Sequence, residues 1–149
     1  EKLSGSYKLL HSPDNLSKGA MEAILKEKEV KEVLDVIENT DILIHGIGRM
    51  DKMASRRGLS QPEIQNLSNL GAVGEAFGYY FDKQGKVVHS SITIGMKNET
   101  LKKINTLVAV AGGSNKAEAI LSVIKNNTKI ILVTDEGAAR GILKIIENE

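Results

Sequence analysis

The sequence contains no cysteine and no tryptophan, and aromatic residues make up only 3% of its 149 positions. Without cysteine the chain can form no disulfide, no thiolate-based zinc finger and no thiol nucleophile. The scarcity of aromatic rings counts against a surface that stacks on nucleic-acid bases. These absences exclude several classes of redox, metal and nucleic-acid site.

An excess of charge of one sign is also lacking, because 20 basic and 19 acidic residues leave a net charge of +1. A nearly neutral chain has no broad basic field with which to wrap DNA. No apolar run approaches the roughly 18 residues of a membrane-spanning helix, and the first ten residues lack the apolar segment of a secretory signal. We therefore expect a cytoplasmic protein with no membrane partner.

The residues that are present are ordinary for one globular domain, with 41% hydrophobic and 26% charged residues. Three short apolar runs, rich in β-branched residues, each lead into a glycine-containing loop. Continuous runs of this kind predict parallel strands that are buried on both faces. The runs cover residues 42–44, 107–111 and 130–133.

Helical periodicity separates these runs. Apolar residues at Ala117, Ile120, Leu121 and Ile124 form one stripe, which Ser114 or Asn115 can cap. Residues 138–146 predict a last helix, and residues 15–39 predict an earlier helical region with a break near Lys28. The alternation of strand, glycine loop and helix predicts an α/β fold.

The middle of the chain has a different pattern. Residues 75–95 read as two strands joined by a turn at 82–85 and followed by a third piece. The predicted fold is therefore α/β and Rossmann-like, with a mainly parallel sheet flanked by helices and an antiparallel hairpin insertion.

The glycine loops are the first candidate site, because ligands of open α/β sheets bind beyond the carboxyl ends of the strands. Glycine allows a close backbone approach, and the following helix offers free N–H groups to an anion. The candidates are Gly46, Gly48, Gly113, Ser114 and Asp135. The alternative is that these glycines only make tight turns and that the acidic pair after the third strand only favours a helix start.

Lys116 is predicted in the first turn of a helix, where a cation opposes the helix dipole unless an anion is bound there. A phosphate would explain its place; a side chain that extends into solvent is the alternative. The loop is not a Walker A motif, and HGIGRMD is not a dinucleotide fingerprint because Asp51 takes the third glycine position.

Arg56 and Arg57 precede Gly58, a pattern that fits either a helix C-terminus or a guanidinium fork for phosphate. Glu75 is the one charge in an apolar stretch. It is either an edge-strand charge facing water or an acceptor for sugar hydroxyls. The three histidines lie in unrelated segments and form no H-E-x-x-H motif, so we expect no metal, no cofactor and no catalytic residue.

These motifs carry a resemblance. HGIG, MASRRG, GAVGEAFGYYFDKQGKVV, VAVAGGSNKAEAI and ILVTDEGAARGIL, in this order, resemble the sugar-binding domain of SorC-type bacterial transcriptional regulators. The branch that controls glycolytic operons fits this pattern well. The resemblance implies a non-enzymatic sensor on a fold related to phosphosugar isomerases and deaminases, with fructose 1,6-bisphosphate as the effector.

The resemblance also implies roles for particular residues. Arg56, or Arg57 if the register differs by one, and Lys116 would hold phosphates, and Glu75 would contact the sugar. Many family members have Asp at the position of Glu75. Complete members also carry a helix-turn-helix DNA reader and a first α/β half with a Gly-Gly-Thr-Thr phosphate loop, and we expect this protein to form a homo-oligomer. Neither part is in residues 1–149, which would thus be the C-terminal part of the effector domain.

Two other functions stay open at the level of sequence. A phosphosugar isomerase or deaminase on the same fold would need a general base, for which Glu75 and Asp135 are the candidates. A pure oligomerisation module would leave the glycine loops with a structural role only.

Overall fold

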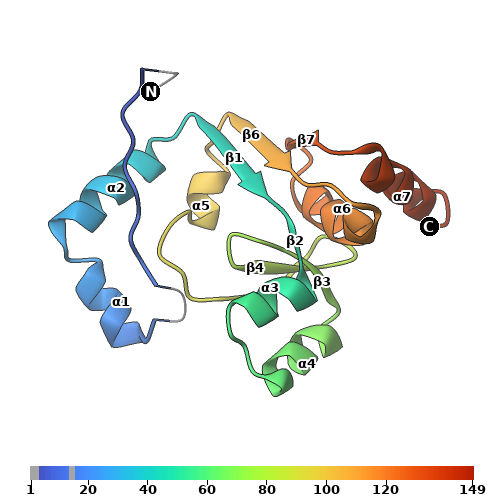
Figure 1. The fold of residues 1–149 in the computed structure, drawn as a ribbon, viewed down its shortest axis with the longest axis horizontal. Coiled ribbons are helices and arrows are strands. Elements are labelled where there is room, and N and C mark those ends of the chain that lie inside the picture. Colours follow the sequence, from blue (N-terminus) through green and yellow to red (C-terminus); the bar gives the residue numbers. More distant parts are fainter. Residues whose placement is uncertain (1–3, 14–15) are drawn as a thin grey trace. The chain divides into compact units, whose positions relative to one another are not determined.

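The computed structural model describes residues 4–13 and 16–149 of the chain (Figure 1). It comprises two compact units, a helical unit (Glu1–Thr40 and Ile92–Lys103) and an α/β unit (Asp41–Ser91 and Ile104–Glu149). In the described residues, no helix is long and apolar enough to cross a bilayer. All the candidate site residues belong to the α/β unit.

The helical unit confirms the predicted break near Lys28. Ser17 caps its first helix by accepting a hydrogen bond from the Ala20 N–H at 3.3 Å. The second helix starts at Lys28, so three residues separate the two; the start predicted at residue 15 lies outside the described residues. The helices are α1 (Lys18–Ile24), α2 (Lys28–Glu38) and the short α5 (Asn98–Leu101).

The α/β unit contains the predicted parallel sheet. Its order is β1-β6-β7, so strands far apart in the sequence lie side by side (Figure 1). The register pairs Gly46 with Val110 and Val110 with Val133. The predicted helices after β6 and β7 are also confirmed. The elements are β1 (Ile42–Gly46), β6 (Thr106–Val110), α6 (Ala117–Asn126), β7 (Ile131–Val133) and α7 (Glu136–Ile146).

The hairpin region forms a separate antiparallel sheet of order β2-β3-β4-β5. The predicted turn at 82–85 is confirmed, since the Gly85 N–H bonds the Asp82 carbonyl at 3.0 Å. After β5, residues 92–95 form no helix or strand. The elements, with two helices that precede β3, are β2 (Gly48–Arg49), α3 (Met50–Arg56), α4 (Gln61–Asn69), β3 (Ala72–Ala76), β4 (Tyr79–Asp82) and β5 (Val87–Ser90).

A second turn, at Phe77 and Gly78, divides the segment predicted as one strand. Both residues have positive φ, 56° and 83°, as a two-residue type I′ turn requires. Asn-Gly is the usual sequence of such a turn. Phenylalanine rarely adopts the left-handed conformation, so Phe-Gly does not indicate a turn from the sequence. The helix α4 is a further element that the sequence pattern did not indicate.

The core of the α/β unit lies on one face of the parallel sheet. Leu107 and Ala109 are buried, and Ala109 packs in a cluster with Ile120 and Val123 of α6. The opposite face is open: Ile44 is 68% exposed. The prediction of strands buried on both faces is therefore wrong for this chain. The exposed apolar residues of the three strands are Ile42, Ile44, Val110, Ile131 and Val133.

Candidate functional site

Three loops meet at the carboxyl ends of the parallel strands. β1 ends at Gly46, β6 at Val110 and β7 at Val133, and the register places these three residues in one row. The loops that follow therefore lie at the same edge of the sheet, which is where ligands of α/β folds bind. The three glycine loops therefore converge at one edge of the sheet.

Lys116 reaches across this edge. Its ammonium Nζ donates to the Ile47 carbonyl oxygen at 3.3 Å, from a residue 69 positions away in the sequence. Lys116 ends a 3₁₀ turn, Ser114–Lys116, and is the N-cap residue of α6, so the predicted cap by Ser114 or Asn115 is wrong. The side chain does not simply extend into solvent. It joins the glycine loop after β6 to the junction of β1 and β2.

Glu75 approaches the same junction from β3. Its side chain is 4% exposed, and β3 lies between β2 and β4, so the alternative of an edge-strand charge facing water is wrong. The register pairs Glu75 with Gly48. A side chain at Gly48 would overlap Met53 and would come within 3.6 Å of Glu75 Oε2. Glycine at this position thus lets three elements approach closely.

The Glu75 carboxylate is held by two donors. Oε1 accepts from Arg57 Nη2 at 3.0 Å and from the Gly78 N–H at 2.6 Å. The first bond is an ion pair between largely buried side chains, and the second fixes the turn at Phe77. A buried carboxylate needs such partners because burial removes its hydration.

The structure distinguishes the two arginines. Arg57 is the C-cap residue of α3 and contacts Glu75, with a side chain that is only 13% exposed. Arg56 is the last residue of α3 and is exposed. Gly58 follows with a φ of 72°, as expected for a residue that ends a helix. The structure therefore brings Arg57, and not Arg56, to Glu75.

Asp135 joins the two remaining loops. Its Oδ1 accepts from the Ala138 N–H at 2.8 Å, which caps α7, and its Oδ2 accepts from the Gly113 N–H at 2.6 Å. Ser114 follows directly and is exposed at the start of the 3₁₀ turn. Gly46 closes β1, and a Cβ atom added there would lie 3.9 Å from the Val110 carbonyl oxygen, its nearest neighbour.

Three aromatic or imidazole side chains near the site were not predicted. The rings of His45 and Phe77 lie 4.5 Å apart, and burial lowers the pKa of His45 below its ordinary value. Tyr80, fully buried, pairs with Glu75 across β3 and β4, and burial raises the pKa of its hydroxyl. All three lie in the HGIG and GAVGEAFGYYF motifs, but only the tertiary fold brings His45 to Phe77.

The local charge favours an anion. Arg57 is already paired with Glu75, whereas Lys116 makes no ion pair with any carboxylate in the part of the chain that the structure describes. An ammonium beside a glycine loop and a helix start is suited to a phosphate. The two carboxylates considered as general bases, Glu75 and Asp135, each accept two hydrogen bonds from protein N–H groups. This arrangement favours binding over proton transfer.

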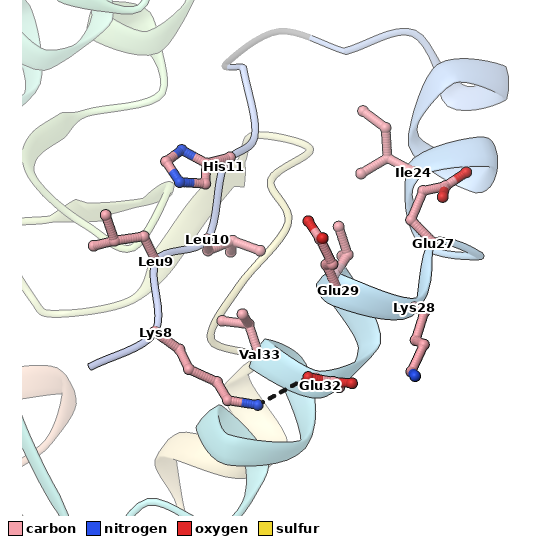
Figure 2. Close-up of a pocket in the computed structure, with 11 residues that line it drawn as sticks. Lys8, Leu9, Leu10, His11, Ile24, Glu27, Lys28, Glu29, Glu32 and Val33 are labelled. Carbon is pink, nitrogen blue, oxygen red and sulfur yellow. Dashed lines mark hydrogen bonds and ion pairs between the residues drawn. The ribbon is translucent and has the colours of Figure 1, made fainter. Parts of the chain in front are cut away.

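The helical unit has a pocket of its own, shown in Figure 2. Leu9, Leu10 and Val33 supply apolar surface, and an ion pair between Lys8 and Glu32 at 3.1 Å closes one side. No candidate site residue lines this pocket, and it is not part of the site.

The sequence and the fold match known transcriptional regulators. The family model described as "Putative sugar-binding domain" matches residues 1–144. The "Central glycolytic genes regulator" of Bacillus subtilis (strain 168) is 46% identical over 144 residues, 97% of this chain and 42% of that protein. The "Transcriptional regulator LsrR" of Escherichia coli (strain K12) is 37% identical, covering 93% of this chain and 47% of that protein.

A solved structure agrees with the sequence relatives. The structure of a protein described as a "putative SorC family transcriptional regulator" from Enterococcus faecalis superposes with a TM-score of 0.86 at 42% identity, covering 93% of this chain and 57% of that chain. The chain thus spans less than half the length of the curated relatives that it matches. These findings establish that the chain belongs to the sugar-binding domain family of SorC-type transcriptional regulators.

Proposed function

We propose that this chain is the phosphosugar-sensing part of a bacterial transcriptional repressor, with fructose 1,6-bisphosphate as its effector. The single observation that carries the proposal is the convergence on residues 47–48: Lys116 bonds the Ile47 carbonyl, and Glu75 pairs with Gly48. Lys116 supplies a charge for a phosphate, and the carboxylate supplies an acceptor for a sugar hydroxyl. The 46% identity to the "Central glycolytic genes regulator" supports a glycolytic effector.

Arg57 is the arginine that we assign to this site, in place of Arg56. Its guanidinium lies at Glu75, whereas Arg56 is exposed at the end of α3. Arg57→Lys keeps a positive charge opposite Glu75 but removes the planar fork that suits phosphate. We expect this variant to bind fructose 1,6-bisphosphate more weakly and Arg56→Ala to bind it as the unaltered protein does. The opposite ranking would return the role to Arg56.

The test of the site is Lys116→Ala, with Lys129→Ala as the matched control. Lys129 is exposed and precedes β7, at the other end of that strand from the site. Calorimetric titration should show weaker binding for Lys116→Ala only, because one phosphate loses its cation. Unchanged affinity in Lys116→Ala, with an unchanged melting temperature, would contradict the assignment.

An enzymatic role is the alternative function. The carboxylates of Glu75 and Asp135 are both engaged with N–H donors, and the relatives that match are regulators, which supports a sensor without turnover. Incubation with several hexose phosphates followed by NMR would decide the question. Steady formation of an isomerised or deaminated product would favour the enzyme.

We also propose that the rest of the effector domain and a DNA-reading domain belong to the same longer protein, which acts in the cytoplasm as a homo-oligomer. The greater length of the curated relatives supports this, as does the open apolar face of the parallel sheet. Effector binding would then shift the equilibrium between DNA-bound and free states by its difference in affinity for the two. A footprint or anisotropy assay on operator DNA, with and without the sugar phosphate, tests this coupling.

A further inference from the structure

We infer that Asp135 is a positioning residue that holds Lys116 in place for the ligand and does not itself contact the ligand. The inference deepens the proposed function and depends on it. It starts from the two hydrogen bonds of the Asp135 carboxylate, one to Gly113, 22 positions before it in the sequence, and one to Ala138, 3 positions after it.

The first bond is local. Asp135 has an extended backbone, and its Oδ1 accepts from the Ala138 N–H at 2.8 Å, which is the usual geometry of an N-cap aspartate. This bond stabilises α7 and involves no other part of the site.

The second bond is a tether between loops. Oδ2 accepts from the Gly113 N–H at 2.6 Å, and Gly113 has a φ of 99°, a backbone conformation that favours glycine. A side chain at the neighbouring Gly112 would overlap the Asp135 carboxylate. The two consecutive glycines therefore allow the carboxylate to close on the loop. On the other side, a side chain at Gly137 would lie 3.6 Å from Ser114 N, so the two loops are in close contact.

The tether continues the pairing of β6 and β7 past the ends of both strands. The Ala111 N–H bonds the Val133 carbonyl at 3.1 Å, and the Thr134 hydroxyl donates to the Ala111 carbonyl at 2.6 Å. Asp135 makes the next link in this series. The loop after β6 is thus held to the loop after β7 at Ala111 and at Gly113.

Lys116 lies directly beyond this link. Its own N–H bonds the Gly113 carbonyl at 2.9 Å, which forms the 3₁₀ turn, and its ammonium bonds the Ile47 carbonyl. Gly113 is therefore held at its N–H by Asp135 and at its carbonyl by Lys116. Release of the first bond frees the turn that sets the position of the ammonium.

Asp135→Ser removes the hydrogen bond to Gly113 and keeps the N-cap bond to Ala138. A serine still accepts from the Ala138 N–H as an N-cap residue, but its shorter side chain cannot also reach Gly113. In the full-length protein we expect a melting temperature close to that of the unaltered protein and a Kd for fructose 1,6-bisphosphate that is weaker by about fivefold or more. In a Lys116→Ala background the same substitution should leave the remaining affinity unchanged, because it acts through Lys116.

Amide hydrogen exchange without ligand supplies an independent readout. Exchange at residues 113–116 should be faster in Asp135→Ser, while exchange at Ala138 should stay as it is. Unchanged exchange at Gly113 would overturn the tether. Tighter binding of fructose 1,6-bisphosphate by Asp135→Ser would show that the carboxylate competes with the phosphate. An equal loss of affinity in the unaltered protein and in Lys116→Ala would show that Asp135 acts independently of Lys116. Either result overturns the inference. If the unaltered protein binds no sugar phosphate, the proposed function fails, and the exchange at Gly113 still decides whether Asp135 holds the loop.

Discussion

Arg57 and Glu75 form an ion pair whose side chains are 13% and 4% exposed, next to the junction at which Lys116 arrives. Loss of Arg57 would leave the buried Glu75 carboxylate without its counter-ion, a change that typically costs about 3–5 kcal/mol. We therefore predict that Arg57→Ala lowers the free energy of unfolding by roughly that amount, as measured by urea denaturation. Because Glu75 bonds both Arg57 and the Gly78 N–H, the ion pair connects the stability of the turn at Phe77 and Gly78 with the position of Glu75 in the site.

Arg56→Ala is the matched control for this prediction. Arg56 is the neighbouring residue and is exposed, so its loss should change the free energy of unfolding by less than about 0.5 kcal/mol. Equal effects of the two substitutions would mean that the ion pair with Glu75 does not contribute as the geometry requires.

At the scale of elements, the contact between β3 and α6 depends on a glycine. A side chain at Gly74 would overlap the Ser122 hydroxyl and come within 2.7 Å of the Ala119 carbonyl. Gly74→Ala should therefore destabilise the protein by about 1–3 kcal/mol through overpacking. Gly46→Ala, where the nearest atom would be 3.9 Å away, should leave the thermal midpoint nearly unchanged. A similar midpoint for both variants would show that α6 can move away from β3 at little cost.

The hydrogen bonds at the start of α4 make the free energy of unfolding depend on pH. The Glu63 carboxylate accepts from the Ser60 hydroxyl at 2.6 Å and from the Ser60 N–H at 2.7 Å, and these bonds lower the pKa of Glu63. Because the folded pKa lies below the unfolded value of 4.5, the stabilisation is present above pH 4.5 and is lost as the pH falls through the folded pKa. The difference in stability between the unaltered protein and Glu63→Gln should therefore shrink on acidification. A constant difference from pH 7 to pH 3 would contradict this.

The elements that the sequence predicted are those with a strong local pattern. The three parallel strands have continuous apolar runs, and α6 and α7 have a clear apolar stripe. The turn at Phe77 was missed because a phenylalanine in the left-handed conformation carries no turn signal and depends on the Glu75 bond to Gly78. The contact of Arg57, and not of Arg56, with Glu75 likewise joins residues 18 positions apart, so no local pattern indicates it.

At the scale of the whole molecule, the main feature is that one apolar face of the parallel sheet stays exposed in this chain. Ile44, on this face, is 68% exposed, whereas Leu107, on the other, is buried. Ile44→Thr should change the free energy of unfolding of the 149-residue chain by less than about 0.5 kcal/mol. In the longer regulator that we propose, the same substitution should cost roughly 1–3 kcal/mol if another part covers the face.

Leu107→Ala is the reference for that comparison, since it removes a buried side chain in either context and should cost about 2–5 kcal/mol in both. Urea denaturation of the 149-residue chain and of the proposed longer regulator, each carrying either substitution, shows whether another part covers this face. An equally small effect of Ile44→Thr in the long protein would mean that the face stays open there.

The most direct measurement is a calorimetric titration of fructose 1,6-bisphosphate into the longer effector domain that we propose, with the 149-residue chain titrated beside it. We predict saturable binding by this domain that Lys116→Ala weakens and Lys129→Ala leaves unchanged, because in our proposal the ammonium that bonds the Ile47 carbonyl also holds a phosphate. The signal from the shorter chain shows how much of the site its own residues supply. The absence of binding to the complete domain, or equal binding by both lysine variants, would contradict the assignment of this site to a phosphosugar.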